Sequence, residues 1–211
     1  MRQRLLSPVV RIIDDEASVR KSESFLVRMS GWSVVEFESA SAFLDNDDKD
    51  HPGCVILDIR MPGMSGLQLQ DEMLRRDIDL PIIFLTGHGD VDMAVKSLLS
   101  GAVEFIVKPP EPERLSCAIR KAIERNMTER QKKMIRQEKL LLWEKLTPTE
   151  KRIAPFVAVG EINKVIAQRQ NVSEQAIKNS RSVIFHKLEV KNPVELNGFM
   201  RMCGLLGENE Q

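Results

Sequence analysis

The chain has few of the residues that build metal centres and covalent frameworks. Its 211 residues include three cysteines and three histidines. The cysteines are odd in number and widely spaced, which predicts free thiols in a reducing cytosol rather than disulfides. The histidines lack metal-ligand spacing, so we expect no zinc site. No apolar run approaches the roughly 20 residues that span a bilayer, and Arg11 interrupts any signal-peptide core. These absences favour a cytoplasmic protein with no membrane association.

The charge that is present is divided unevenly along a chain whose formal net charge is zero. Residues 1–122 contain 15 Lys and Arg against 20 Asp and Glu, whereas residues 123–211 contain 16 against 11. An acidic half followed by a basic half indicates two tasks, and the basic half suits a polyanion such as nucleic acid. Chance is the plain alternative, because a difference of this size is modest.

The acidic half alternates short β-branched runs with segments of helical periodicity. This alternation is typical of a parallel sheet covered by helices on both faces. We therefore predict a five-stranded, doubly wound α/β domain of the flavodoxin-like type, in which ligands bind beyond the carboxyl ends of the strands. The five runs are VVRII (9–13), SVVEF (33–37), CVILD (54–58), PIIFL (81–85) and VEFIV (103–107).

Ionisable residues stand at the ends of three of these runs. Asp14 and Asp15 follow the first, Asp58 closes the third, and Lys108 follows the fifth. Carboxylates brought together repel one another and must hold a cation. Hard oxygen ligands with open positions suit Mg²⁺, which pairs carboxylates with phosphate oxygens. The pattern predicts a phosphoryl-transfer site in which Asp58 is the nucleophile and forms an aspartyl phosphate.

Other groups are expected to complete this site. Lys108 would neutralise the arriving phosphoryl group, and Thr86 with the backbone amides of the Gly87–Gly89 turn would donate hydrogen bonds to its oxygens. The plain alternative is that the aspartates cap turns or helices and that Thr86 closes a turn.

The basic half is predicted to be helical throughout. One long helix runs from Glu111 to about Lys145, and four shorter helices follow it without a strand. Thr147 with Glu150 is expected to form a capping box at the first of the four, and Asn192 with Pro193 to start the last. A short helix, Asn163 to Gln170, precedes a longer one that Ser173 caps, which is the helix-turn-helix outline. We divide the chain into an α/β domain (1–122), a linker helix (123–145) and a helix-turn-helix domain (146–211).

Four motifs in the first domain resemble the receiver domain of two-component response regulators, over roughly residues 8–122. They are DDE (14–16), LDIRMPGMSG (57–66), LTGHGD (85–90) and KPP (108–110). The resemblance implies that a sensor histidine kinase phosphorylates Asp58.

The same resemblance assigns roles to individual residues. It implies that Asp15, Asp58 and the backbone carbonyl of Arg60 hold Mg²⁺, with Asp14 assisting through water. Thr86 and Phe105 are implied to be a switch pair, although many relatives carry tyrosine where this chain has Phe105. The Lys108–Pro109 peptide bond is implied to be cis. A core role for Phe105 remains the alternative.

The second domain resembles the helix-turn-helix output domain of the NarL/FixJ subfamily, also called LuxR-type. The resemblance rests on LTPTEKRI, GEINKVIAQ, VSEQAIKNSR and FHKLEV, over about residues 146–206. It implies that the third helix of the domain enters the DNA major groove. Lys164 and Lys187 would contact phosphates, while Gln175, Lys178 and Asn179 would read base edges. Arg181, on the same recognition helix, is also implied to be a DNA-binding residue.

Four positions depart from the pattern of this output domain. Pro155 falls inside the first helix of the domain and is expected to kink it. Gln170 replaces a usual core leucine, so a polar group would be buried or the helix shortened. Ala176 and Ser180 replace the residues that usually flank Lys178, so the DNA sequence that relatives bind is a poor guide to the sequence that this chain binds.

Taken together, these features predict a response regulator and transcription factor rather than a metabolic enzyme. Its expected partners are a sensor histidine kinase, double-stranded promoter DNA and, on phosphorylation, a second copy of itself. One alternative is a signalling protein that acts through protein–protein contacts with a helix-turn-helix domain that no longer reads DNA. A second is an aspartyl-phosphate hydrolase, but Arg60 stands where that class has its second catalytic aspartate.

Overall fold

The structure is a computed structural model that describes residues 6–87 and 101–206. It divides into two compact units, Met1–Arg130 and Gln131–Gln211, and each is described separately. None of the helices in the described ranges has both the length and the apolar character needed to cross a lipid bilayer.

The first unit is built on a parallel five-stranded sheet, as predicted. Its order is β2-β1-β3-β4-β5, the flavodoxin-like arrangement. The third strand begins one residue earlier than the predicted run, because Gly53 already pairs with Val9 in the parallel ladder. The strands are β1 (Val9–Ile13), β2 (Ser33–Phe37), β3 (Gly53–Leu57), β4 (Ile82–Thr86) and β5 (Glu104–Val107).

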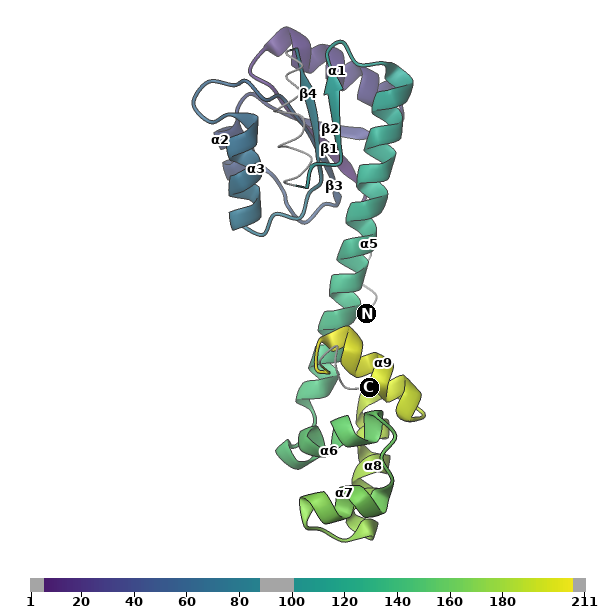
Figure 1. The fold of residues 1–211 in the computed structure, drawn as a ribbon. Helices are drawn as coiled ribbons and strands as arrows, with labels where there is room; N and C mark the ends of the chain where they lie inside the picture. Colours follow the sequence, from purple (N-terminus) through teal and green to yellow (C-terminus); the bar gives the residue numbers. More distant parts are fainter. Residues whose placement is uncertain (1–5, 88–100, 207–211) are drawn as a thin grey trace. The chain divides into compact units, whose positions relative to one another are not determined.

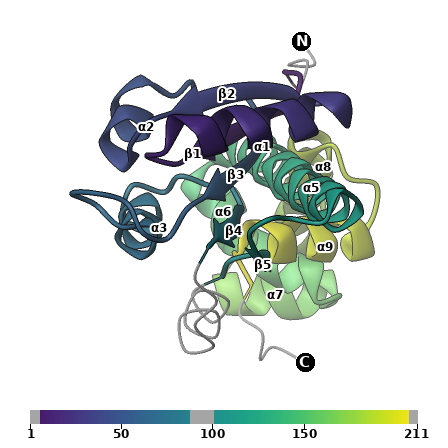
Figure 2. The same ribbon diagram turned by 90° about the horizontal axis from the view of Figure 1, so that it is seen from above.

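Helices cover both faces of this sheet (Figure 1 and Figure 2). On one face lie α1 (Ala17–Met29) and the first part of α5 (Pro112–Glu144). On the other lie α2 (Ala40–Asn46) and α3 (Gly66–Arg75). The residues of β1, β3 and β4 are buried except for the partly buried Val9, as expected of strands covered on both faces, and all but Arg11 and Thr86 are apolar.

The α5 helix is fixed to the first unit by polar contacts beyond its apolar stripe. The buried Asn126 side chain accepts a hydrogen bond from Gly53 N (2.9 Å) and donates one to Asp79 O (2.7 Å). One turn later, Arg130 pairs with the Asp79 carboxylate at 2.6 Å and donates to the Lys49 carbonyl at 2.8 Å. These contacts explain why the first compact unit extends to Arg130.

The second unit contains only helices in its described residues. The end of α5 is followed by α6 (Pro148–Ala158), α7 (Asn163–Gln170), α8 (Glu174–Leu188) and α9 (Pro193–Cys203). The predicted caps are present: Thr147 forms a capping box with Glu150, while Ser173 and Asn192 accept hydrogen bonds from the first turns of α8 and α9.

Two departures from the family pattern are accommodated locally. The α6 helix continues through Pro155, whose carbonyl accepts a hydrogen bond from Val159 N at 3.1 Å. Gln170 is the last residue of α7 and is only partly buried. Asn171 then turns the chain in the left-handed region, at φ 53°. The polar side chain therefore lies at the edge of the apolar core rather than within it.

Candidate functional site

The sheet order brings the predicted nucleophile beside the first acidic pair. Neighbouring β1 and β3 align Ile13 with Leu57, and Asp58 N donates to Ile13 O at 3.0 Å. Asp14 and Asp58 therefore leave the carboxyl edge of the sheet next to each other, where the strand order reverses. Ligands of this fold class bind at that switch point.

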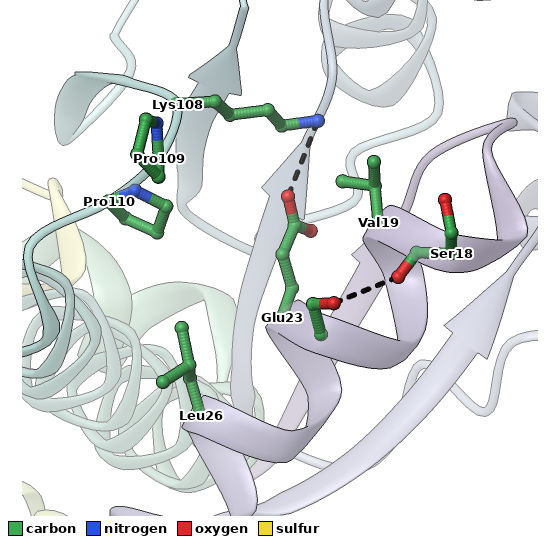
Figure 3. Close-up of a pocket in the computed structure, with 8 residues that line it drawn as sticks. Ser18, Val19, Glu23, Leu26, Lys108, Pro109 and Pro110 are labelled. Atoms are coloured by element: carbon green, nitrogen blue, oxygen red, sulfur yellow. Dashed lines mark hydrogen bonds and ion pairs between the residues drawn. The ribbon is translucent and has the colours of Figure 1, made fainter.

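Lys108 joins the carboxylates of this edge. Its position is set by Thr86, the last residue of β4, whose carbonyl accepts from Lys108 N at 2.8 Å. The Lys108 Nζ donates to Asp14 Oδ2 and lies 3.5 Å from Asp58 Oδ1. It also lies 3.3 Å from Glu23 Oε1 on α1 (Figure 3). The peptide bond between Lys108 and Pro109 is cis, as the family resemblance implied.

The electrostatics of the site follow from burial and close charge. Burial raises the pKa of Asp58 above its usual range and the neighbouring Asp14 raises it further, while Lys108 and the Arg60 backbone N–H oppose the rise. Burial disfavours the Lys108 ammonium, but its hydrogen bond to Asp14 and the surrounding carboxylates prevail and raise its pKa. The lysine is therefore held charged, facing the proposed nucleophile.

The loop after β3 holds the Asp58 carboxylate in place. Arg60 N donates to Asp58 Oδ2 at 3.1 Å, and Gly66 N donates to Ile59 O at 2.9 Å. A Cβ atom at Gly66 would lie 2.3 Å from the Asp58 carbonyl oxygen, which is a severe clash. Glycine is therefore needed at the start of α3 for the close approach to this loop.

The predicted metal ligands differ in their exposure to solvent. Asp14 is buried, Asp58 is partly buried and Asp15 is exposed. Within residues 6–87 and 101–206, no group of three or more His, Cys, Asp or Glu side chains could hold a metal ion. The predicted direct set contains only two carboxylates, from Asp15 and Asp58, with the Arg60 carbonyl as the third donor. These hard oxygen donors at the edge of a buried ion-pair cluster fit Mg²⁺.

The two predicted switch residues lie on neighbouring strands. Thr86 is buried at the end of β4, while Phe105 on β5 is partly buried and packs against the core on the α2 and α3 face. Phe105 pairs across the ladder with Phe84. Of the predicted Gly87–Gly89 turn, the residues after Gly87 lie outside the described ranges.

Sequence reasoning missed one ionisable residue of the site, Glu23. It lies within α1 and is 4% exposed. It occupies the core-facing stripe between Val19 and Val27, four residues from each. A charged residue at a position where helical spacing calls for an apolar one was the available signal.

The predicted DNA-contacting residues gather on α7 and α8 but differ in their surroundings. Lys164, Gln175, Lys178 and Asn179 are exposed. Gln175 Nε2 donates to Asn179 Oδ1 at 3.0 Å, so these two neighbours on α8 already contact each other.

The other two predicted residues make contacts within the unit. Arg181 donates to Asn163 Oδ1 at 3.1 Å and lies over the Phe185 ring at 5.7 Å. Lys187 Nζ lies 2.7 Å from Glu150 Oε2, the carboxylate that completes the α6 capping box. Both basic residues therefore hold α8 against its neighbours.

Comparisons with known proteins agree with this architecture. Residues 10–120 match the family model of the response regulator receiver domain, and residues 144–200 match that of bacterial regulatory proteins of the luxR family. The chain belongs to the response regulators that join a receiver domain to a LuxR-type DNA-binding domain. This class works with a sensor kinase and binds DNA, and receiver domains generally bind Mg²⁺ at their phosphorylation site.

Individual relatives cover nearly the whole chain. Nodulation protein W of Bradyrhizobium diazoefficiens is 36% identical over 199 residues, covering 94% of this chain and 86% of its own. Response regulator protein TodT of Pseudomonas putida is 39% identical over 188 residues, covering 89% and 83%. Among solved structures, response regulator StyR matches with a TM-score of 0.82 at 35% identity, covering 93% of this chain and 99% of its own.

Proposed function

We propose that Asp58 accepts a phosphoryl group from the phosphohistidine of a sensor kinase and that this step controls transcription. The observation that carries the proposal is the Lys108 ammonium 3.5 Å from Asp58 Oδ1 at the switch point of the sheet. In the transfer, an Asp58 carboxylate oxygen bonds to phosphorus, the P–N bond to the kinase imidazole breaks, and the imidazole takes up a proton. The protein is a stoichiometric acceptor in this reaction rather than a turnover enzyme.

The chain's own residues would orient and stabilise the phosphoryl group. Lys108 would move its contact from carboxylate to phosphoryl oxygen, and the Thr86 hydroxyl would donate a hydrogen bond to another oxygen. Asp15, Asp58 and the Arg60 carbonyl would hold Mg²⁺, with Asp14 acting through water. When bound, Mg²⁺ would supply neutralisation of the negative charge on the phosphoryl oxygens.

The output would pass through the switch pair to the second unit. Inward movement of Thr86 and Phe105 would alter the surface near β5, favour dimerisation in the cytoplasm and place two DNA-binding units on two half-sites. The exposed Lys164 would contact phosphate, while Gln175, Lys178 and Asn179 would read base edges from α8.

The remaining two basic residues need a change of partner or a fixed role. Lys187 would contact a phosphate by giving up its ion pair with Glu150, because the N–H that points at the Glu150 carboxylate cannot also donate to a DNA phosphate. Arg181 would keep its contact with Asn163 and so hold α7 against the recognition helix.

Labelling with radioactive acetyl phosphate tests the phosphoryl acceptor. Wild-type protein should incorporate about one phosphoryl group per chain, and Asp58→Asn should incorporate none, because the amide is not a nucleophile. Asp45→Asn, which alters an exposed aspartate of the same unit, should label like wild type. Undiminished labelling of Asp58→Asn would assign the acceptor to another residue.

Selection of genomic DNA fragments tests the output. The purified protein is incubated with fragments in the presence and absence of beryllofluoride and Mg²⁺, which mimic the aspartyl phosphate. We expect enrichment of a discrete repeated or palindromic site only in the activated sample. If folded, beryllofluoride-binding protein enriches no site in either state, the output is protein–protein contact instead.

A further inference from the structure

Glu23 is a buried carboxylate that the general phosphoryl-transfer scheme does not use. It lies on the wall of a pocket of about 430 Å³ between α1 and the segment that contains Lys108 and Pro109 (Figure 3). Its neighbours along the α1 stripe are the apolar Val19 and Val27. Burying a carboxylate on an apolar helix face is costly unless it is paired.

The partner of Glu23 is the lysine of the phosphorylation site. Glu23 Oε1 lies 3.3 Å from Lys108 Nζ, slightly closer than Asp58 Oδ1 at 3.5 Å. Among the described residues, Glu23 Oε1 has no hydrogen-bond partner that meets the usual geometry, and its polar interaction is the ion pair with Lys108. Glu23 therefore competes directly with Asp58 for the same ammonium.

We propose that Glu23 is a positioning residue that holds Lys108 back from the phosphoryl group and so disfavours the phosphorylated state. The proposal rests on Asp58 being the phosphoryl acceptor. Phosphorylation exchanges one carboxylate charge for about two negative charges on the phosphoryl oxygens. Lys108 must then contact these oxygens, and the buried negative charge of Glu23 opposes this in two ways. It attracts the lysine toward α1, and it repels the added phosphoryl charge.

As a consequence, the Glu23 side chain keeps the phosphorylated fraction of the protein low in the absence of a signal. Without the Glu23 charge, Lys108 is shared by Asp14 and Asp58 alone and is available to the phosphoryl group. Phosphorylation becomes more favourable, and loss of the phosphoryl group becomes slower. Glu23 would thus set how much kinase activity is needed to switch the protein on.

Beryllofluoride affinity measures this effect at equilibrium. Full-length wild type, Glu23→Gln and Glu23→Leu are titrated at pH 8, where Glu23 carries its negative charge, with saturating Mg²⁺, and binding is followed by ¹⁹F NMR. Both variants should bind on the order of tenfold more tightly, because each removes the competing charge. Glu23→Leu restores the apolar stripe and guards against a folding defect in Glu23→Gln. Glu124→Gln, which removes an exposed carboxylate from the same unit, should bind like wild type.

A metal-free measurement separates positioning from a structural role. The ¹⁵N signal of the Lys108 ammonium, assigned by its loss in Lys108→Arg, should shift in Glu23→Gln and stay unchanged in Glu124→Gln. Unchanged or weaker beryllofluoride affinity in both Glu23 variants, with Asp58 still labelled by acetyl phosphate, would overturn the proposal. Absence of labelling at Asp58 in the wild type would instead refute the phosphoryl-acceptor assignment itself.

Discussion

At the scale of single residues, Arg11 shows how a buried charge can stabilise the fold away from the functional edge. It is 1% exposed, pairs with Asp47 at 2.9 Å and donates to the carbonyls of Asp48 (2.7 Å) and His51 (2.9 Å). Arg11→Met leaves the Asp47 carboxylate buried without its partner, so we expect a loss of about 3–5 kcal/mol in the free energy of unfolding. Urea denaturation measures this. Arg28 pairs with Glu36 at 4.0 Å and donates to Ser24 Oγ (3.2 Å) and the Val34 carbonyl (3.1 Å), but its side chain is 56% exposed, so Arg28→Met should cost about 1 kcal/mol. Equal losses in Arg11→Met and Arg28→Met would show that burial of the Arg11 pair does not set its contribution to stability.

Glu23 gives the first unit a predictable dependence of stability on pH. Burial raises its pKa from 4.5 to about 7, and the neighbouring carboxylates Asp14 and Asp58 add to the rise while Lys108 opposes it. Below pH 4.5 the folded and unfolded chains both hold the proton. Between pH 4.5 and pH 7 only the folded chain holds the Glu23 proton. The free energy of unfolding should therefore fall by roughly 3 kcal/mol as pH rises through this range, and then level off.

Denaturation at pH 5 and pH 8 without metal should show this fall in wild type and in Glu124→Gln. In Glu23→Gln the fall should be much smaller, with only a contribution from the raised pKa of Asp58 left, and a fall of undiminished size would assign it to another group.

At the scale of secondary-structure elements, the sequence predicts what is local and misses what depends on neighbours. β-branched runs predicted all five strands, and Thr147, Ser173 and Asn192 predicted three helix starts, because capping chemistry lies within four residues. Asn126 carries no such signal. It reads as a surface residue of a helix, and its burial against Gly53 and the Asp79 carbonyl exists only once strands far away in sequence are in place.

The candidate site divides in the same way. The strand-end residues Asp14, Asp58 and Lys108 could be placed together from the sequence, because parallel strands end at one edge. Glu23 could not, since its partner is fixed by the packing of α1 on the sheet rather than by any strand end. The contact of Lys187 with Glu150 was equally hidden, because it joins two helices whose approach the sequence does not specify.

At the scale of the whole molecule, α5 contributes to both compact units, and its end belongs to the core of the second. Trp143 is 8% exposed and packs in the same apolar cluster as Ile153, Leu196 and Phe199. Two residues earlier, Leu141 is 68% exposed. A DNA-binding fragment that begins at residue 146 therefore loses part of its own core, whereas one that begins at residue 131 keeps it.

Thermal and urea unfolding of the two fragments test this division of the chain. Residues 131–211 should unfold cooperatively, and residues 146–211 should be less stable by several kcal/mol, because removing a buried tryptophan side chain alone costs about 3–5 kcal/mol. Within the longer fragment, Trp143→Ala should reproduce most of that loss, while Leu141→Ala should change the free energy of unfolding by less than about 0.5 kcal/mol. Equal stability of the two fragments would mean that the helix end merely lies on the domain, and that the boundary at residue 146 expected from the sequence is also the energetic one.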